Sequence, residues 1–321
     1  MVTTHLHRFN PVGTHRTMTL HQDSYNSSDA LLATRKLAAR RRFLAFTAAA
    51  AGAAWFDLPG MFARAGLADE NDPWHGMPMG VQSYSLREFN TEEAVRHISG
   101  MGLHYVEMYD KHLAKAASDE QIADTLALLK KAEIKLQGHG VHAFTKDHEA
   151  NKKIFEFAKK AGVKTITADP APDSFDSLDK LCEEYQIRIA IHNHGPGSRY
   201  SKIADTSTAV KGRHKFVGAC IDCGHYIRSG EDPVKAVLEL GPRVFAAHIK
   251  DEKEANTPAS NNVVIGKGHL DVVGLFKALK EVKFPAEGSL SLEYEANPKN
   301  PIDEMKACIE VAREAIAKAL A

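Results

Sequence analysis

Short apolar runs alternate with amphipathic stretches along the chain from Met79 onward. Each run has four to six residues, many of them β-branched or small, which is typical of buried parallel strands. Together with the helix-like stretches between them, these runs predict a single (β/α)8 TIM barrel over residues 66–321. The predicted strands are residues 80–84, 105–108, 134–137, 163–167, 187–191, 216–221, 244–249 and 289–292.

The intervening stretches carry the signals of amphipathic helices. Residues 91–95 begin with Thr91, a capping residue type, and continue with an acidic first turn. Residues 151–160 place apolar side chains at helical spacing among lysines. Gly102 and Gly162 follow helical stretches, where a C-terminal cap takes a positive φ. An open, doubly wound sheet is the alternative, but no GxGxxG motif follows the first predicted strand.

The first 65 residues differ from the rest. Residues 1–39 are polar and have no sustained apolar face, which predicts disorder. The arginines and the Phe-Leu pair of residues 40–44 precede an apolar stretch at 45–56, a pattern that resembles a twin-arginine export signal. The Ala-Arg-Ala at 63–65 supplies a cleavage site, so we expect a mature chain from Gly66, exported to the periplasm with only transient membrane contact. A short membrane anchor or a fortuitous alanine-rich helix is the alternative.

Charge and cysteine content exclude several classes of function. Eight of the 41 basic and three of the 41 acidic residues lie in residues 1–65, which leaves an excess of five acidic residues in the predicted barrel. An acidic body argues against a nucleic-acid partner. Cys220 and Cys223 form a CxxC, but residues three apart on a strand face opposite sides, and no second CxxC completes a zinc site. We therefore assign neither a redox nor a zinc-ribbon role.

Polar residues stand at the ends of the last four predicted strands. They are His192, Asp222, His248 and Glu293. Because the C-terminal ends of the strands of a closed barrel meet at one face, we expect these side chains to converge. Two imidazoles and two carboxylates suit Mn, Co, Zn or Fe. The sequence therefore predicts a divalent-metal site formed by these four residues.

Further polar residues lie near the same strand ends. His194 shares a strand face with His192, so either could bind the metal while the other contacts the substrate. His225 could donate to a substrate hydroxyl, and Lys250 could stabilise a developing oxyanion. With Glu293 as the base, these residues make up the predicted catalytic set. Substrate contacts are predicted for Glu107, His139, His142 and Glu295, of which Glu295 also rivals Glu293 for its role, and a structural hydrogen bond is the alternative for each.

Two predicted connections, 195–205 and 251–271, are longer than a βα turn requires. Loops of this length on the C-terminal face of a barrel usually cover a ligand. The alternative is a surface insertion without function, because loops tolerate insertion.

Six motifs follow one another along the predicted barrel: GVQSYSLRE (80–88), HNHG (192–195), IDCGHYIRSGEDP (221–233), HIKD (248–251), IGKGHLD (265–271) and SLEYE (291–295). Over about 240 residues the chain resembles the sugar phosphate isomerase/epimerase family, whose members have a xylose isomerase-like TIM barrel. The resemblance implies a divalent metal at the ends of strands five to eight, chelated by a keto-sugar. It also implies that Asp222, His248 and Glu293 are metal ligands and that His225 contacts the substrate.

One position departs from that family. Keto-sugar epimerases of the group usually place a glutamate at the end of strand five, where it binds the metal and moves a proton, whereas this sequence has His192. One carboxylate base, Glu293 or Glu295, then remains, with a histidine as its acid partner. The first prediction is a metal-dependent keto-sugar isomerase or epimerase that abstracts the proton next to a metal-polarised carbonyl. The alternative, favoured by export and by His192, is a lyase or hydratase that acts by β-elimination or dehydration on a 3-keto-glycoside or an inosose-like substrate.

Two other functions fit less of the sequence. A DNA-repair endonuclease of the related three-zinc barrel type needs a basic groove and more ligands, whereas the predicted barrel is acidic. A non-catalytic sugar-binding module would use the same residues without turnover. The expected partner is a small sugar or keto-sugar, and the resemblance also allows a homo-oligomer.

Overall fold

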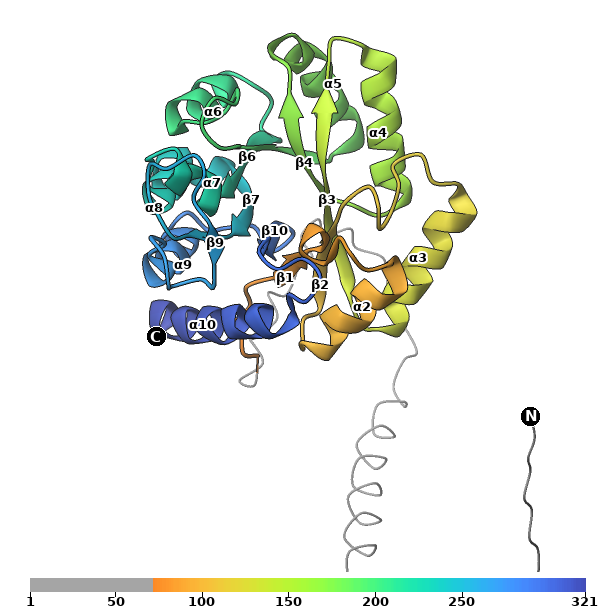
Figure 1. Cartoon of the computed structure of the whole chain (residues 1–321). Coiled ribbons are helices and arrows are strands. Elements are labelled where there is room, and N and C mark those ends of the chain that lie inside the picture. The colour runs from red at the N-terminus through yellow and green to blue at the C-terminus, as the bar shows by residue number, and fades with distance from the viewer. Residues whose placement is uncertain (1–71) are drawn as a thin grey trace, which may run out of the picture. The chain divides into compact units, whose positions relative to one another are not determined.

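In the computed structural model, which describes residues 72–321, eight parallel strands close into a barrel surrounded by helices (Figure 1). Around the barrel the order is β1-β10-β7-β6-β5-β4-β3-β2, so the first and last strands pair and close the sheet. The predicted (β/α)8 TIM barrel is confirmed. The barrel strands are β1 (Met79–Gln82), β2 (Tyr105–Met108), β3 (Lys135–Phe144), β4 (Thr165–Pro170), β5 (Arg188–His192), β6 (Val217–Asp222), β7 (Val244–Ile249) and β10 (Ser289–Leu292).

Three strands have the predicted bounds, and most others are shifted by one to three residues. The largest difference is in β3, which continues to Phe144 instead of ending at Gln137. Residues 138–143 are mainly glycine and histidine, so the apolar signal stops there, while pairing with β4 continues up to Phe144 opposite Pro170. Strand length in this part of the barrel is therefore set by the neighbouring strand and not by the apolar run.

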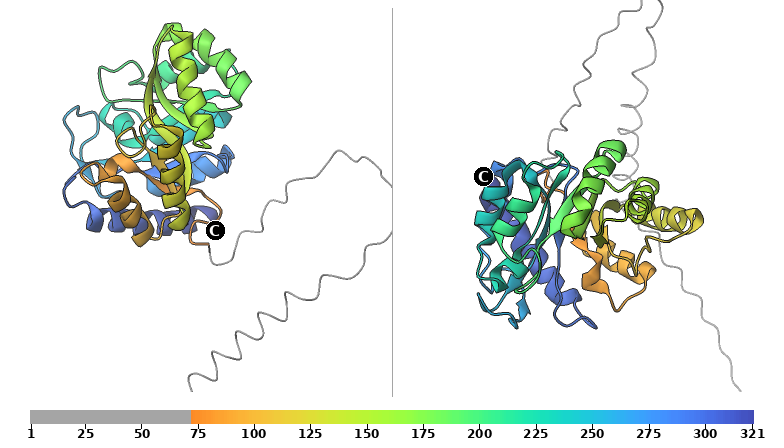
Figure 2. Two further views of the ribbon diagram at one scale, coloured as in Figure 1. Left: turned by 90° about the vertical axis from the view of Figure 1, so that its right-hand side faces the viewer. Right: turned by 90° about the horizontal axis from the view of Figure 1, so that it is seen from above.

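Helices form the outer layer of the barrel, as two further views show (Figure 2). Several of them begin at side-chain caps. The Asn90 side chain accepts a hydrogen bond from the Glu93 backbone N–H, and the Glu93 side chain accepts one from the Asn90 backbone N–H, so Asn90 and not Thr91 caps the first helix. The α-helices are α2 (Thr91–Gly100), α3 (Asp119–Lys131), α4 (His148–Lys160), α5 (Phe175–Tyr185), α6 (Ile203–Val210), α7 (Cys223–Arg228), α8 (Pro233–Leu240), α9 (Val272–Glu281) and α10 (Ile302–Leu320). Single 3-10 turns are η1 (Ser83–Leu86), η2 (Pro172–Ser174) and η3 (Gly241–Arg243).

The main hydrophobic core includes apolar side chains of both the helices and the strands. Phe155 of α4, Leu178 of α5, Phe276 of α9 and Ile316 of α10 are completely buried in it. Burying one such side chain contributes about 1.5–3 kcal/mol, so the helical layer fixes the barrel and with it the relative positions of the strand ends.

Other predictions concern the export signal, a membrane-spanning helix and the CxxC motif. The export signal, its cleavage site and the boundary at Gly66 lie outside the described residues. Within residues 72–321 no helix combines the length and the apolar character that a membrane crossing requires. Cys220 belongs to β6, but Cys223 begins α7, so the CxxC does not lie on one strand as assumed.

Candidate metal centre and its cavity

Four side chains at the C-terminal ends of β5, β6, β7 and β10 lie together in the barrel. His192 ends β5, Asp222 ends β6, His248 lies one residue before the end of β7, and Glu293 follows β10. One nitrogen or oxygen atom from each lies within 4.8 Å of the others. All four side chains are buried. The residues named from the sequence as candidate ligands are thus neighbours in space.

The spacing of these atoms suits a divalent cation. His192 Nε2 lies 3.0 Å from His248 Nδ1 and 3.4 Å from Asp222 Oδ2. His248 Nδ1 lies 3.8 Å from Asp222 Oδ2 and 3.3 Å from Glu293 Oε2. Ligands about 2.1 Å from a tetrahedral cation are about 3.4 Å apart, which is within the measured range. Asp222 Oδ2 and Glu293 Oε2 are also buried, and within residues 72–321 neither accepts a hydrogen bond of good geometry, although both form ion pairs with Lys250. A divalent cation would be a further partner for both oxygens.

A buried carboxylate fixes the orientation of His248. Glu107 Oε2 on β2 lies 3.1 Å from His248 Nε2 and accepts a hydrogen bond from Ser289 Oγ at 2.7 Å. Its Oε1 accepts from Gln82 Nε2 at 2.8 Å and from Thr167 Oγ1 at 2.6 Å. Burial alone would raise the pKa of Glu107, but His248 and the hydroxyl donors lower it to about 2. Because His248 donates its Nε2–H to this carboxylate, its Nδ1 is presented to the other ligands.

The DxxGH motif is built at the start of α7. Asp222 caps this helix, since its Oδ1 accepts from the His225 backbone N–H at 2.7 Å. Asn193 holds the backbone of Asp222 through two hydrogen bonds, of 2.8 and 2.9 Å. At Gly224 an added Cβ would lie 2.6 Å from Lys250 Cδ. The glycine is therefore needed because the Lys250 side chain passes close to the helix backbone.

Lys250 is a buried ammonium among carboxylates. Its Nζ lies 3.0 Å from Asp222 Oδ2, 2.7 Å from Glu293 Oε2 and 2.6 Å from Glu295 Oε1. Burial alone would lower the pKa of Lys250, but these carboxylates hold it well above its usual value. Lys250 is only 1% exposed and does not line the cavity described below, so a direct contact with a substrate oxyanion does not fit this geometry.

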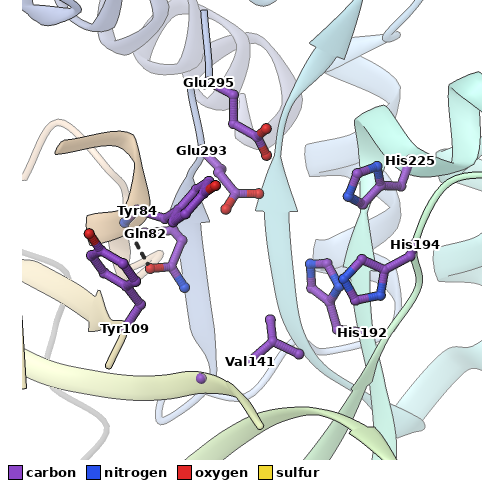
Figure 3. Close-up of a pocket in the computed structure, with 10 residues that line it drawn as sticks. Gln82, Tyr84, Tyr109, Val141, His192, His194, His225, Glu293 and Glu295 are labelled. Carbon is purple, nitrogen blue, oxygen red and sulfur yellow. Dashed lines mark hydrogen bonds between the residues drawn. The ribbon is translucent and has the colours of Figure 1, made fainter. Parts of the chain in front are cut away.

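A cavity of about 370 Å³ opens above the candidate ligands (Figure 3). Figure 3 shows His192, His194 and His225 on one wall, facing Glu293 and Glu295. Burial lowers the pKa of His194 to about 4 and that of His225 to about 3, so both imidazoles are neutral near pH 7. One wall is therefore acidic and the opposite wall consists of neutral imidazoles. The lining residues are Gln82, Tyr84, Tyr109, Gly140, Val141, His192, His194, His225, Glu293 and Glu295.

Most of the barrel also matches a known family of sequences. Residues 95–315 match the family described as xylose isomerase-like TIM barrel. This chain is a member of that family.

Known proteins related to it include enzymes that act on sugars or inososes. An inosose dehydratase from Clostridium botulinum (strain Eklund 17B / Type B) is 28% identical over 145 residues, which cover 40% of this chain and 48% of the relative. The chain thus spans about half the length of the curated relatives it matches. Among solved structures, the IOLI protein with a binding zinc atom has a TM-score of 0.62 and 19% identity, covering 76% of this chain and 99% of that one. The structure of D-psicose 3-epimerase in the presence of D-fructose has a TM-score of 0.57 and 16% identity, and the match covers 75% of this chain and 97% of that one. At these identities, the similarity to both structures concerns the fold alone.

Three of the four predicted substrate contacts do not line the cavity. Glu107 is fully buried beneath His248. His139 and His142 are also buried and hydrogen-bond each other, Nδ1 to Nε2, at 2.7 Å. His139 Nε2 contacts the Leu113 carbonyl oxygen at 2.7 Å, and its ring packs against Phe157 of α4. The structural hydrogen bond weighed as the alternative therefore describes all three, whereas Glu295 does line the cavity.

Five lining residues had no role in the sequence-based prediction: Gln82, Tyr84, Tyr109, Gly140 and Val141. Tyr84 and Tyr109 form an edge-to-face pair with ring centroids 5.3 Å apart, and Gln82 binds Glu107. Gln82 and Tyr84 lie in the GVQSYSLRE motif, which was the available signal for them. For Tyr109, directly after β2, the only signal was its position at a strand end.

Neither of the two long connections contributes a lining residue to the cavity. In the first, Tyr200 donates its hydroxyl to the Pro170 carbonyl, and Arg199 pairs with Asp169. In the second, a short hairpin of β8 (Asp251–Glu252) and β9 (Asn262–Val263) forms. Closure of these loops over a bound ligand stays a prediction.

Proposed function

We propose that this protein is a divalent-metal-dependent keto-sugar isomerase or epimerase. The observation that carries the proposal is the convergence of His192, Asp222, His248 and Glu293 within 4.8 Å, at the floor of an open cavity. A divalent cation bound there supplies Lewis-acid polarisation of a ketone carbonyl, which makes the neighbouring C–H acidic. The metal is Mn, Co, Zn or Fe, since nitrogen and oxygen ligands suit all of them.

Each wall of the cavity has its own part in the proposed reaction. Glu293 Oε2 faces the other ligands, which leaves Oε1 to take the proton next to the carbonyl. Glu295, held by Lys250, contacts substrate hydroxyls beside it. On the opposite wall His194 and His225 donate N–H groups to the substrate oxygens. Lys250 acts as a positioning residue, because it contacts the carboxylates and does not reach the cavity.

A lyase or hydratase is the second candidate, and the imidazole wall favours it. Epimerisation by two carboxylates needs one on each face of the substrate, whereas both glutamates of this cavity lie on the same side (Figure 3). In the elimination, Glu293 takes the proton next to the carbonyl, and the β C–O bond breaks with its electron pair on oxygen. A neutral imidazole N–H donates a hydrogen bond to that oxygen, which takes its proton from water, and the hydroxide so formed is neutralised by the proton that Glu293 took. The partial similarity to inosose dehydratases supports the same candidate.

Deuterium incorporation tests the step that both candidates share. The purified chain with Mn²⁺ is incubated in D₂O with free ketoses and with 3-keto-glucosides. Metal-dependent incorporation next to the carbonyl is expected, and Glu293→Gln should abolish it, while Glu310→Gln on the exposed face of α10 should not. No incorporation into any of these compounds would overturn the proposal. Interconverted ketoses identify the isomerase, and release of the aglycone identifies the lyase.

The proposed function also concerns where the protein acts and what it binds. A small keto-sugar is the proposed partner, and nucleic acid is not expected for an acidic barrel. Export through the twin-arginine pathway and formation of a homo-oligomer stay predictions. Export would place the enzyme among glycosides more readily than among sugar phosphates, which fits the second candidate.

A further inference from the structure

His192 and His248 belong to a second cluster, which includes a cysteine. Cys220 lies on β6 two residues before Asp222, so its side chain is on the same face of the strand and one layer deeper. Its strand partners are His192 on β5 and Ala246 on β7, and Ala246 is two residues before His248. One ligand atom from each of His192, Cys220 and His248 lies within 4.8 Å of the others.

The three side chains of this cluster are buried, and apolar residues surround the cysteine. Cys220 and His248 are completely buried, and His192 is 3% exposed. Cys220 packs in a small apolar cluster with Ala190, Phe245 and Ala246. His192 Nδ1 is buried and has no hydrogen-bond partner among the described residues. Within this set of a thiol and two imidazoles, Cys220 is the donor that no step of the proposed reaction uses.

We propose that His192, Cys220 and His248 form a second coordination position, which takes soft, thiophilic cations such as Cd²⁺ and Cu⁺. Sulfur and imidazole select such ions, whereas the carboxylates of Asp222 and Glu293 favour harder ones. Binding breaks the S–H bond, releases the proton to solvent and forms a sulfur–cation bond without any change of oxidation state. Because both positions need the same two imidazoles, a soft cation displaces the working cation and inhibits the enzyme. The inference shares two ligands with the proposed function and does not depend on the reaction catalysed.

Titration of the full chain, loaded with Mn²⁺, with Cd²⁺ tests the competition. The readouts are the ultraviolet sulfur-to-cadmium charge-transfer band and the release of Mn²⁺, followed by electron paramagnetic resonance. We expect the band to saturate at one Cd²⁺ per chain as one Mn²⁺ is released. Cys220→Ser should lose the band and still bind Mn²⁺. The matched control Cys223→Ser, which replaces an equally buried cysteine, should keep the band.

Two outcomes would overturn the proposal: a band that survives in Cys220→Ser, or Cd²⁺ and Mn²⁺ bound to one chain together. If Cys220→Ser does not fold, the cadmium NMR shift of the wild-type chain decides, because sulfur ligation moves it far from the range of nitrogen and oxygen ligands. A shift in the latter range would also overturn the proposal. All these readouts measure binding, so their failure leaves the proposed keto-sugar activity standing, and an inactive protein that shows the band counts against that activity alone.

Discussion

Glu107 acts on the candidate metal centre without lining its cavity. Its carboxylate accepts five hydrogen bonds in the barrel interior, from Gln82, Thr167, Ser289, Ser291 and the imidazole of His248. Such a carboxylate holds a ligating imidazole in one orientation and increases its basicity. We predict that Glu107→Gln keeps the fold and lowers the affinity for Mn²⁺ by about 10–100-fold, measured by isothermal titration calorimetry. Glu287→Gln is the control, because Glu287 is exposed and precedes β10, whereas Glu293 follows it. Equal affinity in both variants would contradict the role of Glu107.

Gly224 illustrates how a motif residue can serve packing. In a helix, alanine normally stabilises relative to glycine by about 0.5–1 kcal/mol. At Gly224 the new Cβ would lie 2.6 Å from Lys250 Cδ and 2.7 Å from its Cγ, so we predict that Gly224→Ala lowers the free energy of unfolding by about 1–3 kcal/mol. Gly100→Ala, in α2 with no atom near the added Cβ, should raise it instead. Urea unfolding of both variants checks the prediction, and an equal gain in both would refute it.

The sequence predicted the four candidate metal ligands but not the position of Glu107 in the site. His192, Asp222, His248 and Glu293 each stop an apolar run, and closure of the barrel then brings them together. Glu107 also follows apolar residues at a strand end, but the pattern does not reveal that the neighbouring hydroxyls and His248 enclose its carboxylate. Whether a strand-end side chain faces the cavity or the interior depends on strand register, which is a property of the closed barrel.

At the scale of elements, Asp251 holds the connection after β7. Its Oδ1 accepts from the backbone N–H groups of residues 252, 269 and 270, and its Oδ2 from those of residues 266 and 268, all at 2.8–2.9 Å. Both ends of the 251–271 segment are thereby tied to one carboxylate. We call residues 251–271, which these hydrogen bonds order, the strap. The length of the segment in the sequence did not predict these hydrogen bonds.

Replacement of this carboxylate should release the strap. In Asp251→Asn one oxygen becomes an NH₂ group that meets backbone donors, so we predict a loss of about 2–4 kcal/mol in the stability of the segment. Limited trypsin digestion with mass spectrometry should then show faster cleavage at Lys253 and Lys267, which lie within the strap. Asp173→Asn, at an exposed position, should be cleaved like the wild type. Unchanged cleavage in Asp251→Asn would show that the carboxylate does not hold the strap.

At the scale of the whole molecule, pairing of β1 with β10 closes the barrel. The alternation of strands and helices was sufficient to predict this closure, because eight such units complete a barrel. All four candidate metal ligands come from β5 to β10, so the centre depends on the second half of the chain, while Gln82, Tyr84 and Tyr109 from the first half complete the cavity. The four candidate ligands thus lie in the second half of the chain, whereas residues of both halves line the cavity.

The pH dependence of global stability should depend on Glu252. Its side chain is buried, and Oε2 has no hydrogen-bond partner among the described residues. Burial raises its pKa to about 7, although the Ser260 side chain, Lys250 and Arg228 lower it. The folded state therefore favours the protonated carboxyl. Below the ordinary pKa of 4.5 the carboxyl is protonated in both the folded and the unfolded chain. Between pH 4.5 and about 7 it ionises in the unfolded chain first, so the free energy of unfolding falls as the pH rises. Above about pH 7 it is ionised in both, and the loss of stability stays constant.

Glu252→Gln removes this cost, because its side chain does not ionise. We predict that the variant is more stable than the wild type by about 2–3 kcal/mol at pH 8 and by less than about 1 kcal/mol at pH 4.5, since each pKa unit corresponds to about 1.4 kcal/mol. Urea unfolding at the two pH values measures the difference. Glu281→Gln, at an exposed position of α9, should follow the wild type at both. If Glu252→Gln has the same advantage at both pH values, its effect comes from packing and not from the burial of a charge.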